Sequence, residues 1–143
     1  MTAQSVDAVD HAGMAVLPYD ECLRLLVATP VGRVAFVTGG EIVILPVNYV
    51  LDGANVVFRS DGGAKLTAAQ EAKTVGFEID GWDPRLAEGW SVIINGRAEA
   101  VYDEATIERL DGLELHAWGG DTARRAWIMI HSTAVSGRRF APR

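Results

Sequence analysis

The chain has 143 residues, the usual length of a single domain, and its 49% hydrophobic and 22% charged residues are typical of a globular protein rather than a disordered one. Thirteen basic against 19 acidic residues give a net charge of −6, which argues against nonspecific binding to nucleic acids or anionic membranes, because phosphate polyanions would be repelled. No apolar run approaches the ~20 residues of a membrane span and no targeting segment stands out, so we expect a cytoplasmic protein.

The N-terminal region is predicted to be an arm followed by a helix. Residues 1–16 are mostly small and polar, and we expect a flexible arm ahead of one domain, residues 17–143. The helix is expected from Pro18 to Thr29, because proline suits a first helical position and the residue before Pro30 avoids helical geometry. The single cysteine, Cys22, lies on the apolar stripe of this helix and is expected to be a small buried residue rather than a nucleophile.

Three strands are predicted to follow, joined by turns at Gly39–Gly40 and Asp52–Gly53. They span residues 32–38, 41–51 and 54–60. Because they are adjacent in sequence, we expect them to pair with one another in antiparallel fashion. Pro46 lies inside the second strand, and since proline cannot donate to a ladder it predicts an edge or a bulge.

The second half of the chain continues this pattern. We predict a helix at 64–72, a strand at 74–80, a loop at 81–89, the longest strand at 90–102, a helix capped by Asp103, and closing strands at 126–132 and 135–140. Gly96 inside the longest strand indicates a bulge where the sheet bends. Six or seven antiparallel strands with a few short helices predict a mainly β fold, a small closed or partly open β-barrel.

No catalytic or metal motif is recognisable. The sequence lacks GxGxxG after a strand, a Walker loop, a GxSxG elbow and HExxH. The three histidines, His11, His116 and His131, share no metal-ligand spacing, so no metal site is predicted.

The best candidate for ligand binding is the segment from Phe58 to Leu66, where a strand ends and a glycine-rich loop opens a helix. Glycines let a backbone approach a phosphate, and a helix start presents free N–H groups. Arg59, Ser60 and Lys65 add a guanidinium, a hydroxyl and an ammonium group, which suit a phosphate monoester. The alternative is a solvated turn with two exposed cations.

Two further features suit a flat ligand. Asn48, next to Val47, is an amide among apolar neighbours, which either meets the edge of a heteroaromatic ring or faces water on an edge strand. Trp90–Ser91 opens the longest strand, and four tryptophans in a small domain could form a stacking wall, a core or a dimer interface.

Taken in order, these segments resemble the pyridoxamine 5′-phosphate oxidase-like family of FMN-binding split barrels, from about Leu17 to Phe140. The segments that carry the resemblance are Glu21–Leu23, Gly32–Ala35, Pro46–Val50, Phe58–Ser60 with Lys65–Leu66, Val75–Ile79, Gly89–Val92, Asn95–Ala98 and Ser136–Phe140. Their shared order and spacing is the specific signal, and no single segment is.

The resemblance implies a split β-barrel of FMN-binding type with antiparallel strands, and a homodimer with cofactor sites at the subunit interface. The residues it places at the cofactor are Pro46, Val47, Asn48, Phe58, Arg59, Ser60, Lys65, Leu66, Glu78, Trp90 and Ser91. Of these, Arg59, Ser60 and Lys65 match positions that hold the phosphate. Ala64 departs from the pattern, because many relatives carry a hydroxyl or basic residue there.

The function implied is that of an FMN-dependent oxidoreductase acting on a small-molecule substrate, with the flavin supplying the chemistry and no catalytic residue identified. One alternative is a deazaflavin-dependent reductase, for which Arg124 and Arg125 could hold the longer anionic tail. Another is a non-catalytic flavin- or haem-binding protein, with His116 or His131 as the haem ligand. A third is a dimeric scaffold that has lost its cofactor.

Overall fold

The computed structural model describes residues 9–10, 13–71, 73–113 and 126–142, with the side chains of residues 64–66 left out. Among these residues no helix is long and apolar enough to cross a membrane. The helices are α1 (Tyr19–Ala28), α2 (Ala64–Gln70) and α3 (Glu104–Asp111). The strands are β1 (Ala15–Val16), β2 (Val31–Thr38), β3 (Glu41–Asn48), β4 (Val50–Asp52), β5 (Asn55–Ser60), β6 (Thr74–Asp83), β7 (Glu88–Ala100) and β8 (Ala126–Phe140).

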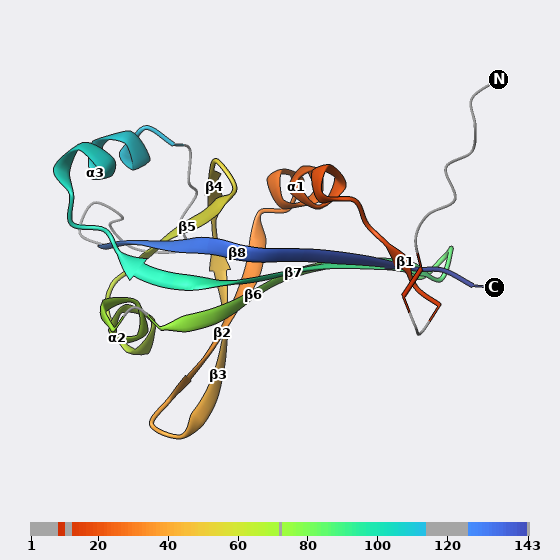
Figure 1. Cartoon of the computed structure of the whole chain (residues 1–143), viewed down its shortest axis with the longest axis horizontal. Helices are drawn as coiled ribbons and strands as arrows, with labels where there is room; N and C mark the ends of the chain where they lie inside the picture. Colours follow the sequence, from red (N-terminus) through yellow and green to blue (C-terminus); the bar gives the residue numbers. More distant parts are fainter. Residues whose placement is uncertain (1–8, 11–12, 72, 114–125, 143) are drawn as a thin grey trace.

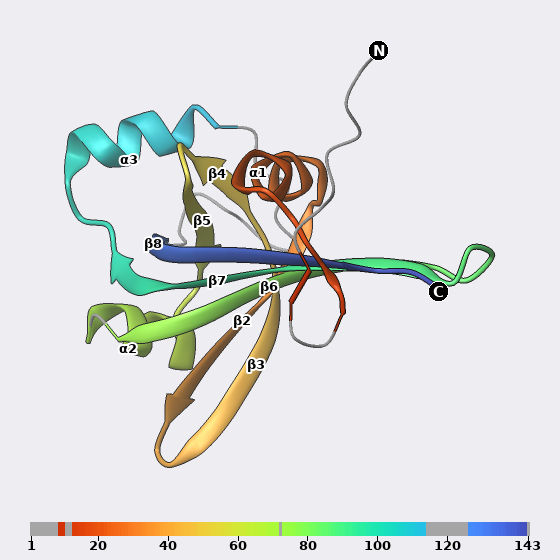
Figure 2. The same cartoon turned by 45° about the vertical axis from the view of Figure 1, so that its right-hand side comes forward.

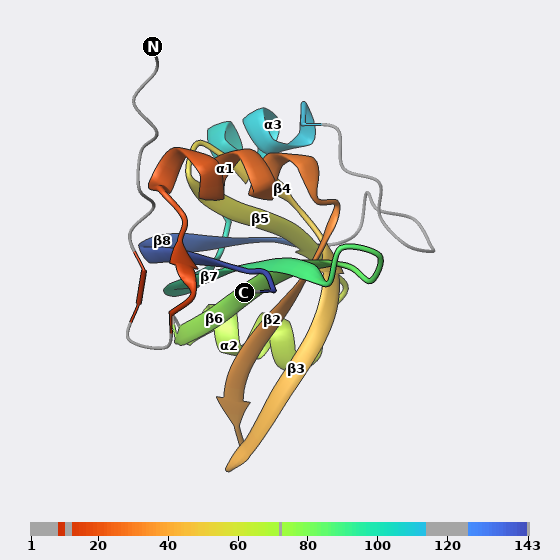
Figure 3. The same cartoon turned by 90° about the vertical axis from the view of Figure 1, so that its right-hand side faces the viewer.

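The strands form one antiparallel sheet in the order β3-β2-β6-β7-β8-β5-β4, and β1 adds to β8 (Figure 1). The mainly β prediction is therefore confirmed. Figure 3 shows the sheet curling, with β4 and β5 on one side and the β2–β3 hairpin projecting on the other. The β6–β7 hairpin extends beyond the rest of the sheet (Figure 2).

Alternate residues of each strand point to one of two faces, as the pleat requires. The inner face holds the main core, with buried side chains such as Phe58, Phe77, Val92 and Ile94, and α1 packs on it through Leu26. The outer face carries the residues that alternate with these along each strand. At one end of the outer face α3 covers a second, smaller cluster, formed by Val57, Leu110, Trp127 and Met129.

Several local predictions are confirmed. The helix predicted over 18–29 is α1, and Asp103 caps α3 by accepting the Thr106 N–H at 3.0 Å. Gly39 and Gly40 form the predicted turn with φ of 56° and 77°. The β7–β8 register shifts between Asn95 and Gly96, at the predicted bulge. Cys22 is buried, as expected, and desolvation raises the pKa of its thiol.

The predicted antiparallel pairing in the first half of the chain is confirmed, because β2 pairs with β3 and β4 pairs with β5. The predicted second strand is divided, however, into β3 and β4, which lie at opposite edges of the sheet. The predicted second strand breaks at Tyr49, whose N–H donates to the Pro30 carbonyl at 3.4 Å. Pro46 therefore lies on an edge, as its missing N–H requires.

One loop prediction and the division of the last strand are wrong. Most of residues 81–89 is strand, because β6 runs to Asp83 and β7 begins at Glu88. The two closing strands are the single strand β8, which at 15 residues is longer than β7 at 13. Within the predicted arm, Ala15–Val16 pairs with β8, while residues 1–8 and 11–12 lie outside the described part of the chain.

Candidate functional site

The predicted phosphate loop joins β5 to α2. Ser60 ends β5 on the inner face with 2% of its surface exposed. Its hydroxyl donates to the Gly62 carbonyl at 3.1 Å and lies 3.4 Å from the Gly62 N–H. Gly62 and Gly63 have φ of 117° and 80°, which favour glycine, and a Cβ on either would meet no atom within 4 Å. The backbone of this loop is therefore shaped by Ser60 and open toward its surroundings.

The other predicted residues at this end are distributed differently. Phe58 is buried in the main core, so it supports β5 from the inner face. Lys65 and Leu66 lie in the first turn of α2, but their side chains are outside the described part. A contact between Lys65 and a phosphate thus remains a prediction.

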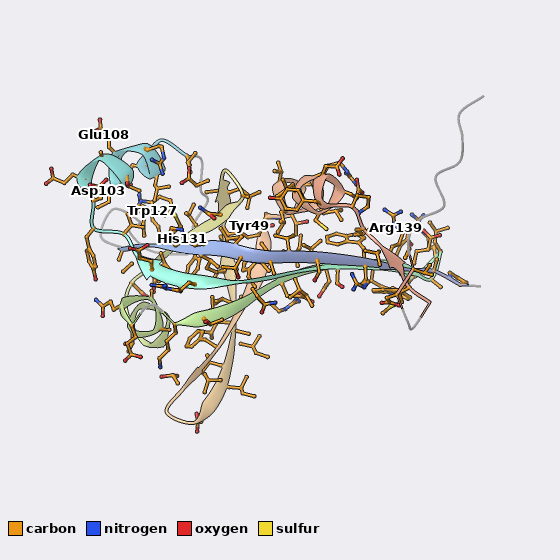
Figure 4. All side chains as sticks on the ribbon, viewed as in Figure 1. Tyr49, Asp103, Glu108, Trp127, His131 and Arg139 are labelled. Atoms are coloured by element: carbon orange, nitrogen blue, oxygen red, sulfur yellow. The ribbon has the colours of Figure 1, made fainter. Side chains whose placement is uncertain are left out.

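Arg59 points to the outer face, away from the direction of Ser60. Its guanidinium carbon lies 4.2 Å from the centroid of the Trp127 ring, and it forms an ion pair with Asp111 at the end of α3. Figure 4 shows Trp127 between α3 and β8. The contact between Arg59 and a phosphate remains a prediction. The structure gives Arg59 two protein partners that the sequence did not suggest.

The residues predicted near the flat ligand are divided between the two faces. Strand pairing places Pro46 and Glu78 on either side of Arg33, and Ser91 beside Asp80, all on the outer face. Asn48 shares this face by alternation along β3. The inner face receives Val47 and Trp90 instead, and both pack against the main core.

A charge cluster lies on the outer face around Arg33. Its Nη1 is 3.2 Å from Glu78 Oε1 and 3.1 Å from Asp80 Oδ2. Burial of Glu78 and its hydrogen bond and charge repulsion with Asp80 raise the pKa of the Glu78 carboxyl, and Arg33 opposes this rise only in part. The Glu78 carboxyl therefore keeps its proton to a higher pH than an ordinary glutamate does. Sequence reasoning missed Asp80, whose only signal was its position two residues after Glu78.

The tryptophans do not form one wall. The Trp90 indole lies on Gly81, where a Cβ would come within 2.6 Å of its Nε1. Trp82 is on the opposite face, stacked on Phe140 with ring centroids 6.2 Å apart. Trp127 lies under α3, and Trp118 is outside the described residues.

The two halves of the predicted site are far apart in one chain. Ser60 pairs with Ala126 at the start of β8, and Trp90 pairs with Arg139 near its end. A strand rises about 3.3 Å per residue, so these 13 steps correspond to roughly 40 Å along β8. Figure 4 labels Trp127 and Arg139 at the two ends of this strand.

Two open clefts lie at these ends. One of about 370 Å³ is lined by Trp90, Arg139 and the tip of the β6–β7 hairpin. The other, of about 480 Å³, lies beside α3 and includes His131, whose Nε2 is 2.7 Å from Glu99 Oε2. No group of three or more His, Cys, Asp or Glu in the described part could hold a metal ion. The other candidate ligands, His116, Arg124 and Arg125, lie outside that part.

Comparison with known proteins gives a consistent result. The family model described as pyridoxamine 5′-phosphate oxidase matches residues 18–139. Uncharacterized protein Rv0080 of Mycobacterium tuberculosis is 36% identical over 129 residues, which cover 87% of this chain and 84% of that protein.

Solved structures agree with this match. An FAD-binding protein from Mycobacterium smegmatis is 34% identical with a TM-score of 0.75, covering 88% of this chain and 99% of the other. A conserved protein of unknown function from Corynebacterium diphtheriae is 31% identical with a TM-score of 0.76, covering 90% and 98%. These likenesses confirm the predicted split-barrel fold.

Proposed function

Since the chain belongs to the pyridoxamine 5′-phosphate oxidase family, we propose that it is a homodimeric flavoprotein, binding FMN between two copies and using it as an oxidoreductase on a small molecule. The observation that carries this proposal is the separation of the Ser60 loop from Trp90–Ser91. The family resemblance assigns the Ser60 loop and Trp90–Ser91 to one cofactor, yet the two segments lie at opposite ends of β8. A site that contains both segments therefore needs the second copy to supply one of them.

The loop fits a flavin phosphate by its shape and chemistry. Gly62 and Gly63 leave the backbone open, and Ser60 at the end of β5, whose hydroxyl donates to the Gly62 carbonyl, holds the loop in shape. Lys65 in the first turn of α2 adds a positive charge in an otherwise acidic chain. These groups would hold the ribityl phosphate, which FMN and FAD share.

The outer face fits a second copy. Large exposed apolar side chains lie along this face on four neighbouring strands, from Val37 and Ile42 at one end, through Ile44 and Ile93, to Trp82 near the tip of the β6–β7 hairpin. Apolar surface of this kind marks an interaction site in soluble proteins. The same face holds Pro46, Asn48, Glu78 and Ser91, so a copy packed on it would also enclose the predicted ring-facing residues.

A bound flavin supplies the redox chemistry at its N5 atom. The chain contributes binding, orientation and the exclusion of water. Glu78, with its raised pKa, is the group on the outer face best suited to hold a proton beside the ring.

FAD is the second candidate, because the 34% identical protein from Mycobacterium smegmatis is an FAD-binding protein. The test is the absorbance of the purified protein as isolated, followed by titration with FMN and FAD under flavin fluorescence, with the mass in solution measured by light scattering. Saturable quenching at micromolar flavin in a dimer supports the proposal, and the tighter ligand identifies the cofactor. A folded dimer that quenches neither flavin contradicts it, and a Soret band in the isolated protein would favour haem.

A further inference from the structure

Arg59 is enclosed on the outer face at the point where β5 meets the proposed phosphate loop. Only 14% of its side chain is exposed. The guanidinium lies over the Trp127 ring at 4.2 Å and donates through Nη2 to Asp111 Oδ1. A planar guanidinium stacked on an indole and bonded to a carboxylate is held in one orientation more firmly than a lysine would be.

Asp111 joins three elements through a single oxygen. Its Oδ1 also accepts the Trp127 indole N–H at 2.8 Å, so the last residue of α3 is tied to both β5 and β8. Leu110, the preceding residue, is completely buried in the small cluster beneath α3. The end of α3 is therefore anchored beside the residue that precedes Ser60.

We propose that Asp111 is a positioning residue for the phosphate end of the flavin site. By holding Arg59 on the outer face, it fixes the end of β5, and with it the orientation of the Ser60 hydroxyl and the adjoining loop. This inference rests on the proposed function. It assigns a role to α3, none of whose residues belongs to the predicted site.

The strand geometry supports an indirect role for Arg59. Ser60 and Arg59 are consecutive on β5, so their side chains leave opposite faces of the sheet. The charge of Arg59 is already matched by Asp111. If Arg59 bound the phosphate directly, Asp111 would compete with the phosphate for the guanidinium. Removing the Asp111 charge would then strengthen FMN binding instead of weakening it.

The decisive variant is Asp111→Asn, which keeps the shape of the side chain and removes its charge. We expect FMN to bind roughly three- to thirtyfold more weakly, the range seen when a coupled residue is altered. The affinity for riboflavin, which lacks the phosphate, should be unchanged. In the flavin-free protein, amide hydrogen exchange at residues 60–63 should become faster, because the loop has lost its anchor.

Asp52→Asn is the matched control. Asp52 accepts from Arg109 of α3 at 2.7 Å, so this variant weakens a second ion pair of the same helix without touching Arg59. It should leave FMN affinity and exchange in the loop unchanged. If Asp111→Asn fails to fold, Trp127→Phe replaces it, since it removes the N–H bond to Asp111 and keeps an aromatic ring under Arg59.

The proposal is overturned if Asp111→Asn tightens FMN or leaves it unaffected, if riboflavin weakens equally, or if Asp52→Asn has the same effect. If the wild-type protein binds neither FMN nor FAD, the proposed function fails. Exchange at residues 60–63 then decides by itself whether Asp111 anchors the loop.

Discussion

Ser60 and Trp90 both pair with β8, but at its opposite ends, Ser60 with Ala126 and Trp90 with Arg139. The fold thus separates the proposed phosphate loop (residues 60–63) from the Trp90–Ser91 segment by the length of β8. In the proposed two-fold dimer the same surface patch is presented by both subunits, so the loop of one copy can face Trp90–Ser91 of the other. We therefore expect two equivalent composite sites.

Mixed dimers test this arrangement. Lys65→Ala removes a charge from the loop and should weaken flavin binding by roughly 10- to 100-fold. Ser91→Tyr should block flavin binding, because it places a large side chain on the outer face where the flavin ring is proposed to lie. Each variant alone should lack a tight site. Co-expressed, they should form mixed dimers with one intact site and one carrying both changes, so titration should recover one tight flavin per mixed dimer. Recovery of none would place the loop and Ser91 of each site on the same chain.

Ile44→Lys should separate the two copies. Ile44 is 61% exposed on the outer face, so a lysine there costs the folded chain little but would bury a charge in the proposed interface. We expect a shift from dimer to monomer in light scattering and a parallel loss of flavin binding. Val27→Lys is the control, since Val27 is 75% exposed on α1 and lies off that face. A monomeric Ile44→Lys protein that binds flavin normally would show that one chain suffices.

Features set by local chemistry could be predicted from the sequence. The Gly39–Gly40 turn depends on the positive φ that glycine adopts freely, and the Asp103 cap depends on the N–H of a residue three positions further on. The Gly96 bulge is indicated by a glycine inside a long strand. At Gly96 a Cβ would come within 2.4 Å of the His131 carbonyl oxygen, which explains why the bulge requires glycine.

Features set by distant partners could not be predicted. Gly81 and Gly89 indicate a loop when read locally, yet they lie in strands, where their missing side chains make room for the rings of Trp90 and Phe140. In the same way, Asp111 and Arg59 are 52 residues apart, and nothing in either segment indicates that they meet. The residue types of the loop were visible in the sequence, but the anchoring of the loop was not.

Tyr49→Phe should lower the free energy of unfolding by about 1–3 kcal/mol. Tyr49 is buried at the break between β3 and β4, and its hydroxyl donates to the Leu26 carbonyl at 2.6 Å, which links the sheet to α1. Burial also raises the pKa of this hydroxyl, so it remains a donor over the whole physiological range. Urea denaturation measures the effect, with Tyr19→Phe on the exposed side of α1 as control. Equal midpoints for the two variants would show that the buried hydrogen bond adds nothing.

Glu78→Gln should change how stability depends on pH. Because the folded protein raises the pKa of Glu78, it binds more protons than the unfolded chain at pH values just above the ordinary glutamate pKa of about 4.3. Stability from this group is therefore present at lower pH and is lost as pH rises through the folded pKa. Glutamine removes this loss while its carbonyl can still accept from Arg33. Urea denaturation between about pH 4 and pH 7 should show the variant gaining stability over the wild type as pH rises. A difference that stays constant or shrinks with pH would show that Arg33, rather than burial and Asp80, dominates at this carboxyl.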